Sequence, residues 1–149
     1  MDTLFDPAVR DRILARIDSL RPDSPRQWGK MDPAQTMAHC ALALEAATGD
    51  AVLHSNFMAK LIGPLFKGWI VGPKPFSRNS PTHPMLVMKT SCDFAREKTR
   101  LIAAVRKFHD AGPVCAAKYR HAFVQKLTGD EWGRVQHKHL DHHLGQFAV

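Results

Sequence analysis

The C-terminal part of the chain contains the stretch Thr128-Gly-Asp-Glu-Trp-Gly-Arg-Val-Gln-His-Lys-His-Leu-Asp-His-His-Leu-Gly-Gln-Phe147, which carries four of the nine histidines. Thr128 and Glu131 have the spacing of a capping box, in which each side chain accepts a hydrogen bond from the other residue's backbone N–H group. A helix is therefore predicted to begin at Gly129, and we take the rest of the protein to be organised around it.

The faces of this helix follow from a rotation of about 100° per residue. One line along it combines apolar and polar side chains: Trp132, Val135, His139, His143 and Gln146. His139 and His143 are therefore expected to point inward. His137 is expected on the opposite, solvated side, whereas His142 lies at the edge of the inward face and its direction stays open.

Three further helices are predicted from apolar residues at three- and four-residue steps, over residues 7–20, 33–48 and 93–109. Asp6, Asp32 and Asp93 are good N-caps, and Gly49 is a good helix stop. Ala111-Gly112-Pro113 is expected to end the third of these helices. Residues 49–85 are rich in glycine and proline, which predicts a long crossover over one end of the bundle, as a lid or as a structural brace.

The predicted fold is thus all-α: a four-helix bundle forming one domain over residues 1–149, with a long crossover between helices 2 and 3. The chain has 149 residues, 44% of them hydrophobic and 23% charged, as in ordinary globular proteins. No apolar run is long enough to span a membrane. The N-terminus lacks the basic start of a signal peptide, and the cysteine count is odd, so a cytoplasmic location is expected.

The net charge of +7 raises the question of an anionic partner. The lysines and arginines are scattered, however, and no aromatic residues alternate with them in the way that favours stacking on bases. Nucleic-acid binding is therefore not the favoured interpretation.

The histidine spacing predicts a metal site. His139 and His143 are four residues apart on one helix, so both rings can reach one ion. His39 is the best third ligand because it lies in the middle of another strongly predicted helix. The alternative is that these are ordinary core or surface histidines. Leu140 occupies the place of the glutamate base of H-E-x-x-H metalloproteases, which argues against that mechanism.

Gln146 and Cys40 are neighbours of these histidines. Gln146 lies on the same face as His139 and His143, and can either orient a ligand or cap a buried polar group. Cys40 adjoins His39 but points about 100° away along the helix. It is therefore expected to pack as a small apolar residue rather than to act as a nucleophile.

Three motifs resemble the DinB/YfiT-like superfamily of proposed metalloenzymes: His139-Leu-Asp-His-His143-Leu-Gly-Gln146, Trp28-Gly-Lys-Met31 and Gln35-Thr-Met-Ala-His39-Cys. More closely, the chain resembles a branch known only as a domain of unknown function, in which a segment like residues 127–133 precedes the H-x-x-x-H helix. The similarity spans nearly the whole chain and is weakest over residues 49–85.

The resemblance implies a four-helix bundle with a divalent metal, commonly nickel or zinc, held by three histidines at one end. By motif match these are His39, His139 and His143, the same residues that helical spacing selects. The branch tends to carry a histidine followed by proline where this chain has His121-Ala122. The role of His121 is therefore left open.

The characterised relatives include metal-dependent transferases and isomerases that use low-molecular-weight thiols such as bacillithiol or mycothiol. The first hypothesis is therefore a metal-dependent enzyme, a transferase or hydrolase, most plausibly similar to thiol S-transferases. The second is a non-catalytic metal- or ligand-binding bundle involved in stress response, which the lack of a recognisable general base favours. Bundles of this size often pair through an apolar face, so a homodimer is also considered.

Overall fold

The structure is a computed structural model that describes residues 1–54, 61–80 and 82–149. These residues form five α-helices, two short 3₁₀ helices and no strands: α1 (Pro7–Ser19), α2 (Pro33–Thr48), η1 (Gly63–Phe66), α4 (Lys67–Val71), η2 (Pro84–Leu86), α5 (Phe94–Ala116) and α6 (Gly129–Gly145). The predicted all-α class is confirmed for this part of the chain. Within it, no helix is both long enough and apolar enough to cross a bilayer.

The helix starts follow the predicted caps. Asp6, Asp32, Asp93 and Thr128 each accept a hydrogen bond from a backbone N–H group in the first turn of the helix that follows. At α6 the capping box is complete, because Glu131 N–H donates to Thr128 Oγ1 over 3.2 Å and Thr128 N–H donates to Glu131 Oε2 over 2.8 Å. The predicted start of the histidine-bearing helix is therefore confirmed.

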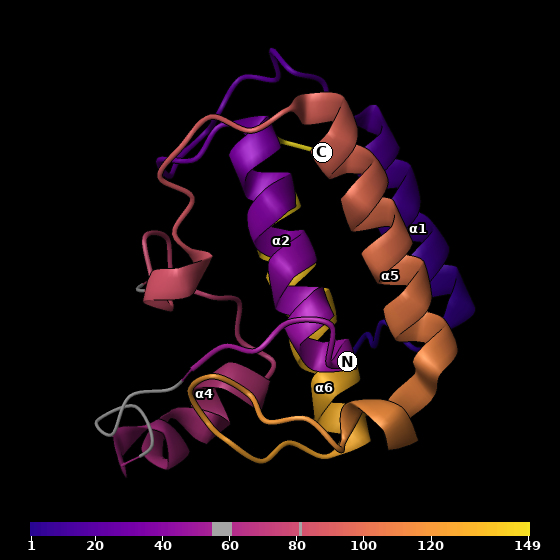
Figure 1. Cartoon of the computed structure of the whole chain (residues 1–149), viewed down its shortest axis with the longest axis vertical. Helices are drawn as coiled ribbons and strands as arrows, with labels where there is room; N and C mark the ends of the chain where they lie inside the picture. Colours follow the sequence, from indigo (N-terminus) through magenta and orange to yellow (C-terminus); the bar gives the residue numbers. More distant parts are fainter. Residues whose placement is uncertain (55–60, 81) are drawn as a thin grey trace.

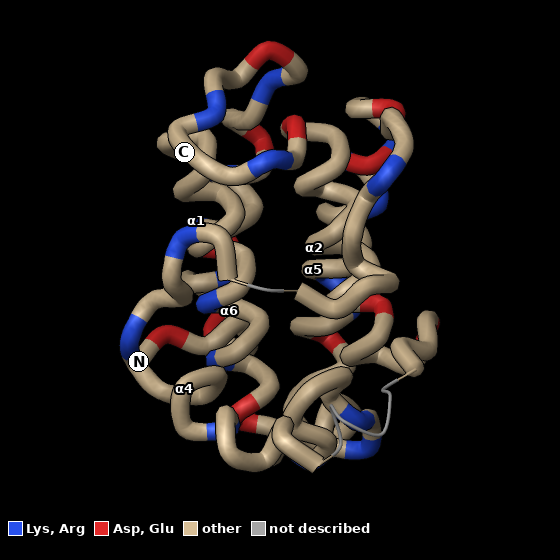
Figure 2. The backbone as a smooth tube through the Cα atoms, turned by 90° about the vertical axis from the view of Figure 1, so that its left-hand side faces the viewer, with Lys and Arg blue, Asp and Glu red and all other residues tan. Residues whose placement is uncertain are grey.

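The four long helices lie side by side around a shared core. α5 and α6 each pack against both α1 and α2, and α1 and α6 lie on one side while α2 and α5 lie on the other (Figure 2). α2 is buried on more than one face, because apolar residues occur all round it. Figure 2 also shows that the Lys and Arg residues are scattered over the fold.

The prediction for the third long helix was only partly right. α5 continues to Ala116, but its helical geometry breaks at Gly112, whose φ is 74° and ψ 174°. Glycine adopts this left-handed φ without steric cost, and Pro113 then begins one further turn, a position that proline tolerates. The expected stop is thus a sharp break followed by a short helical extension.

The crossover from α2 to α5 runs beside α2 (Figure 1). It contains the short helices η1, α4 and η2. It reaches the middle of α2, where Leu86 bonds to His39, so the expectation that it covers one end of the bundle was incomplete. Residues 55–60 and 81 of the crossover lie outside the described residues.

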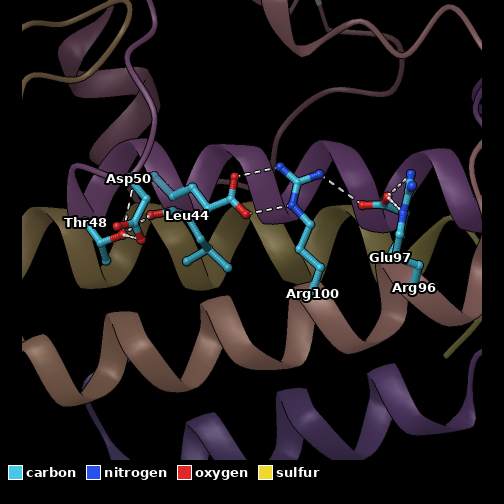
Figure 3. A network of polar contacts seen from close by, with 7 residues as sticks. Leu44, Thr48, Asp50, Arg96, Glu97 and Arg100 are labelled. Carbon is cyan, nitrogen blue, oxygen red and sulfur yellow. Dashed lines mark hydrogen bonds and ion pairs between the residues drawn. The ribbon is translucent and has the colours of Figure 1, made fainter.

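A chain of ion pairs joins α2 to α5 on the side away from α6 (Figure 3). Arg100 of α5 donates to both carboxylate oxygens of Glu45 of α2, over 2.7 and 2.6 Å, and to Glu97 over 3.0 Å. The Glu97 side chain is only 3% exposed and is also paired with Arg96 at 2.8 Å. These pairs raise the pKa of Arg100, chiefly through the hydrogen bonds to Glu45. The bidentate geometry fixes how the two helices align.

Replacing Arg100 by methionine should lower the free energy of unfolding by about 1 kcal/mol, since the apolar stem stays but the bridge between helices is lost. Urea denaturation measures the change. Arg106→Met is the matched control, because Arg106 is exposed on the same helix and has no ion pair among the described residues. Equal stability of the two variants would show that the bridge contributes nothing.

Candidate metal centre

Three histidines from two helices meet in the space between α2 and α6. His39 comes from the middle of α2, and His139 and His143 come from successive turns of α6. One ring nitrogen of each lies within 4.8 Å of the other two. The ring centroids are 4.5 to 5.0 Å apart. The sequence therefore selected three residues that the fold brings together.

Hydrogen bonds fix which nitrogen carries the proton in two of the rings. His39 Nδ1 lies 2.7 Å from the carbonyl oxygen of Leu86, and His143 Nδ1 lies 2.7 Å from Gln146 Oε1. Both oxygens only accept, so each Nδ1 must donate. The Nε2 atoms of His39 and His143 are then unprotonated, and each has a lone pair. This is the form in which imidazole binds a metal ion.

The spacing of the nitrogens suits a shared ion. The Nε2 atoms of His39 and His139 are 2.9 Å apart. Two nitrogens bound to one ion at about 2.0–2.1 Å lie about 2.8–3.4 Å apart for bond angles of about 90–110°. The three imidazoles can therefore hold a divalent cation, and their donor set is typical of zinc, nickel or copper.

Gln146 is itself held in place by the loop before α2. Its backbone oxygen accepts from Gln27 N–H over 2.7 Å, and its amide nitrogen packs on Gly29. Gly29 has a φ of 90°, a backbone conformation that favours glycine, and a Cβ atom added there would overlap that nitrogen. Of the two roles considered for Gln146, the structure shows that it bonds a buried histidine.

Burial keeps the three rings uncharged. Desolvation lowers the pKa of His39, against a smaller opposing effect of its bond to Leu86. Desolvation, followed by the positive charges of neighbouring histidines, lowers the pKa of His139 far below its usual range. Desolvation is also the main reason that the pKa of His143 falls to about 3. All three are neutral at pH 7, so no proton competes with a cation there.

The triad opens into a cavity of about 450 Å³ between α2, α6 and the crossover. His39 and His143 are nearly covered, whereas His139 keeps some exposed surface. The walls are largely apolar and aromatic, and include Trp28, Trp69, Phe76, Leu86, Phe123 and Trp132. Such a cavity can enclose a small molecule next to the three histidines.

Lys138 anchors the crossover wall of this cavity. Its Nζ donates to the carbonyl oxygens of Trp69, Ile70 and Gly72 over 2.8, 3.2 and 3.1 Å. The ammonium also lies 4.2 Å from the ring centroid of Phe76. The last carbonyl groups of α4 and an aromatic face thus stabilise a buried cation. Burial lowers the pKa of Lys138, but these contacts account for its place inside.

The other residues singled out from the sequence have mixed outcomes. His137 was expected to be solvated, but it is half-buried beside Asp2, 3.9 Å away, because the N-terminal segment packs along α6. His142 lies at the edge of the site, as its angle indicated, with its ring 4.6 Å from Trp28. Cys40 is buried in the core, and burial raises the pKa of its thiol, so its apolar role is confirmed.

Sequence reasoning missed several residues around the triad. Leu86 contributes a backbone oxygen, which leaves no signal in the sequence. Lys138 follows the pattern of an exposed helical lysine, and only the position of α4 explains its burial. His121, whose role was left open, lines the cavity.

A comparison with protein families matches residues 7–149 to a family described as a protein of unknown function, DUF1569. The chain belongs to the DUF1569 family. No curated protein and no solved structure matches it. The description of DUF1569 names no activity.

The lowered histidine pKa values predict an acid-sensitive fold in the metal-free protein. Unfolding frees these rings to bind protons at their ordinary pKa near 6.5. The unfolded state therefore binds more protons below about pH 6.5, and the free energy of unfolding of this DUF1569 protein should fall steadily from there toward pH 4. Urea denaturation at pH 7, 6 and 5 in the presence of a chelator measures the slope.

The control for this pH dependence is His143→Gln, which removes one lowered pKa while keeping a polar side chain. Its slope below pH 6 should be shallower by about 1.4 kcal/mol per pH unit, the effect of one proton. A parent protein of constant stability from pH 7 to 5 would contradict the proposed neutral state of the rings.

Proposed function

We propose that this protein is a metal-dependent enzyme in which His39, His139 and His143 bind one divalent ion, nickel or zinc. The observation that carries the proposal is the convergence of three ring nitrogens, one from each histidine, within 4.8 Å of one another. Nε2 of His39 lies 2.9 Å from Nε2 of His139, while the Nδ1 atoms of His39 and His143 are committed as donors elsewhere. The resemblance to the DinB/YfiT-like four-helix bundles supports the same ligand set.

Three protein ligands leave coordination positions for a further molecule, as in catalytic sites. When bound, the ion would supply a Lewis acid that lowers the pKa of a coordinated water or thiol. The protein's own part is to hold the three rings in fixed tautomers and to enclose the reactants within apolar walls. Neither of these roles needs a further ionised side chain.

The cavity wall favours a thiol over a hydrolytic reaction. No Asp or Glu is among the described residues that line it, so a carboxylate base for activating water is missing. A thiol has an ordinary pKa of about 8.5 and ionises near neutral pH without such a base. We therefore propose a transfer reaction of the thiol S-transferase kind, with a low-molecular-weight thiol and a small electrophile as substrates.

The absence of Asp and Glu among the described residues that line the cavity also supports a second candidate function. Without a carboxylate base, the site can bind a metal or ligand without performing catalysis, as in a stress-related binding protein. Thiol-dependent turnover of electrophiles by the metal-loaded protein separates the two candidates. Turnover that stops when His139 is replaced supports the enzyme.

Replacing His139 by alanine should abolish stoichiometric metal binding while the far-UV circular dichroism stays helical, because the ring borders the cavity rather than the core. Elemental analysis of untagged protein, loaded with nickel or zinc and then desalted, measures this. His137→Ala is the matched control on the same helix and should keep the metal. If the parent protein binds neither ion, or if both variants lose it equally, the metal site is refuted.

Gln146→Leu should weaken metal affinity about 10- to 100-fold, because the amide that fixes the proton of His143 is lost. Competition with a chromophoric chelator measures the affinity. Gln136→Leu is the control, since Gln136 lies on the same helix and donates to Ala43 O at 3.4 Å rather than to a histidine. Equal affinity of the Gln146 variant and the parent would contradict the supporting role.

A further inference from the structure

The described residues that line the cavity beside the three histidines carry positive charges and no negative ones. Lys30 and Arg120 are the charged side chains among the described residues that line it, and no carboxylate accompanies them. The sequence has no acid at residues 55–60 or at 81, so none is missing from this description. Neither cation forms an ion pair within the described part of the chain. Both side chains are exposed to solvent, and an anionic ligand that enters the cavity would meet these cations and no opposing acid.

The two cations lie at opposite ends of the cavity. Lys30 comes just before α2 begins at Pro33. Arg120 follows Tyr119, whose ring packs on Gly49 at the other end of that helix. α2 has 16 residues, which corresponds to about 24 Å. One small ligand therefore cannot meet both charges, and the surroundings decide which end binds its acidic group.

The Arg120 end offers further hydrogen-bond donors. His121 Nδ1 accepts from the N–H groups of Phe123 and Val124 over 3.2 and 3.4 Å. The proton of this neutral ring is therefore on Nε2, which is a donor. Burial, followed by the charge of His83, lowers the pKa of His121 to about 4, so the ring is neutral at pH 7.

Trp132 adds a second neutral donor at this end. Its ring centroid is 5.3 Å from that of His121. The side chain is 2% exposed, and its indole N–H has no acceptor among the described residues. A buried donor without a partner destabilises the fold, and an acceptor supplied by a ligand would relieve this cost.

This end also adjoins the triad. His121 and His139 line the same cavity. Leu53, Ile70 and Phe123 supply apolar surface in the same cavity. A ligand bound at Arg120 can therefore extend along an apolar wall toward the three histidines.

We propose that the substrate of the site is a small anionic molecule with an apolar body, whose acidic group binds to Arg120, His121 Nε2–H and the indole N–H of Trp132. This inference names the substrate class and rests on the proposed function for its catalytic meaning. The acidic group is recognised by protein donors, whereas the metal ion acts at the other end of the molecule. Arg120, rather than the metal ion, therefore selects ligands that carry an acidic group.

The three tryptophans of the chain all line the cavity, so their fluorescence reports its occupancy. The probes are octanoate and octanamide, which have the same length and differ in charge. Both are titrated at pH 7.5 into metal-free and zinc-loaded protein. We expect octanoate to bind at least about tenfold more tightly than octanamide in both forms, the effect of a charge-assisted hydrogen bond.

Arg120→Gln should remove this preference, leaving octanamide binding and zinc content unchanged. Lys30→Gln is the matched control, because it removes a cavity-lining cation at the other end, and it should keep the preference. His121→Phe should weaken octanoate binding about threefold or more without affecting octanamide.

The outcomes separate this inference from the proposed function. Equal binding of the two probes in both forms overturns the anion subsite. A preference that appears only with zinc and survives Arg120→Gln also overturns it, since the carboxylate then binds the ion. If zinc fails to bind but the preference for octanoate depends on Arg120, the subsite stands and the metal-dependent function falls.

Discussion

The hydrogen bonds that hold the Nδ1 protons of His39 and His143 constrain much of the rest of the structure. Three uncharged imidazole rings in a buried space are stable only when their polar atoms are satisfied. The partner of His39 is a backbone oxygen of the crossover, and that of His143 is the side chain of Gln146. Two irregular segments, the crossover and the loop that packs on Gln146, are therefore as necessary to the site as the helices that carry the rings.

One side of α2 packs on α5, and the other side lines the cavity. Toward α5, the helix is aligned by the bidentate pair between Glu45 and Arg100 and by a continuous apolar core. Toward the crossover, it presents His39 with Ala43 and Ala46, which line the cavity. Small side chains leave the space that larger ones would fill, and close packing on the other face keeps that space from collapsing. A bundle can thus keep an open cavity without losing its core.

The parts of the site that lie on helices could be predicted from the sequence, because a period of 3.6 residues fixes which side chains share a face. This argument found His139 and His143 together and selected His39 from the middle of α2. It did not find the Leu86 carbonyl, because a backbone contact depends on the path of an irregular segment. It also placed His137 in solvent, since local periodicity contains nothing about the N-terminal segment that packs over it.

Lys138 shows why the cavity is preformed. Its ammonium group holds three carbonyl oxygens of the crossover from a position next to His139, and none of these contacts involves the triad. The wall bearing Trp69 and Phe76 is therefore tied to α6 whether or not the histidines bind anything. A wall fixed in this way reduces the conformational entropy lost when a ligand binds. The exposed Arg120 lines the other side of the cavity, so the proposed anionic ligand would meet this cation before it reaches the histidines.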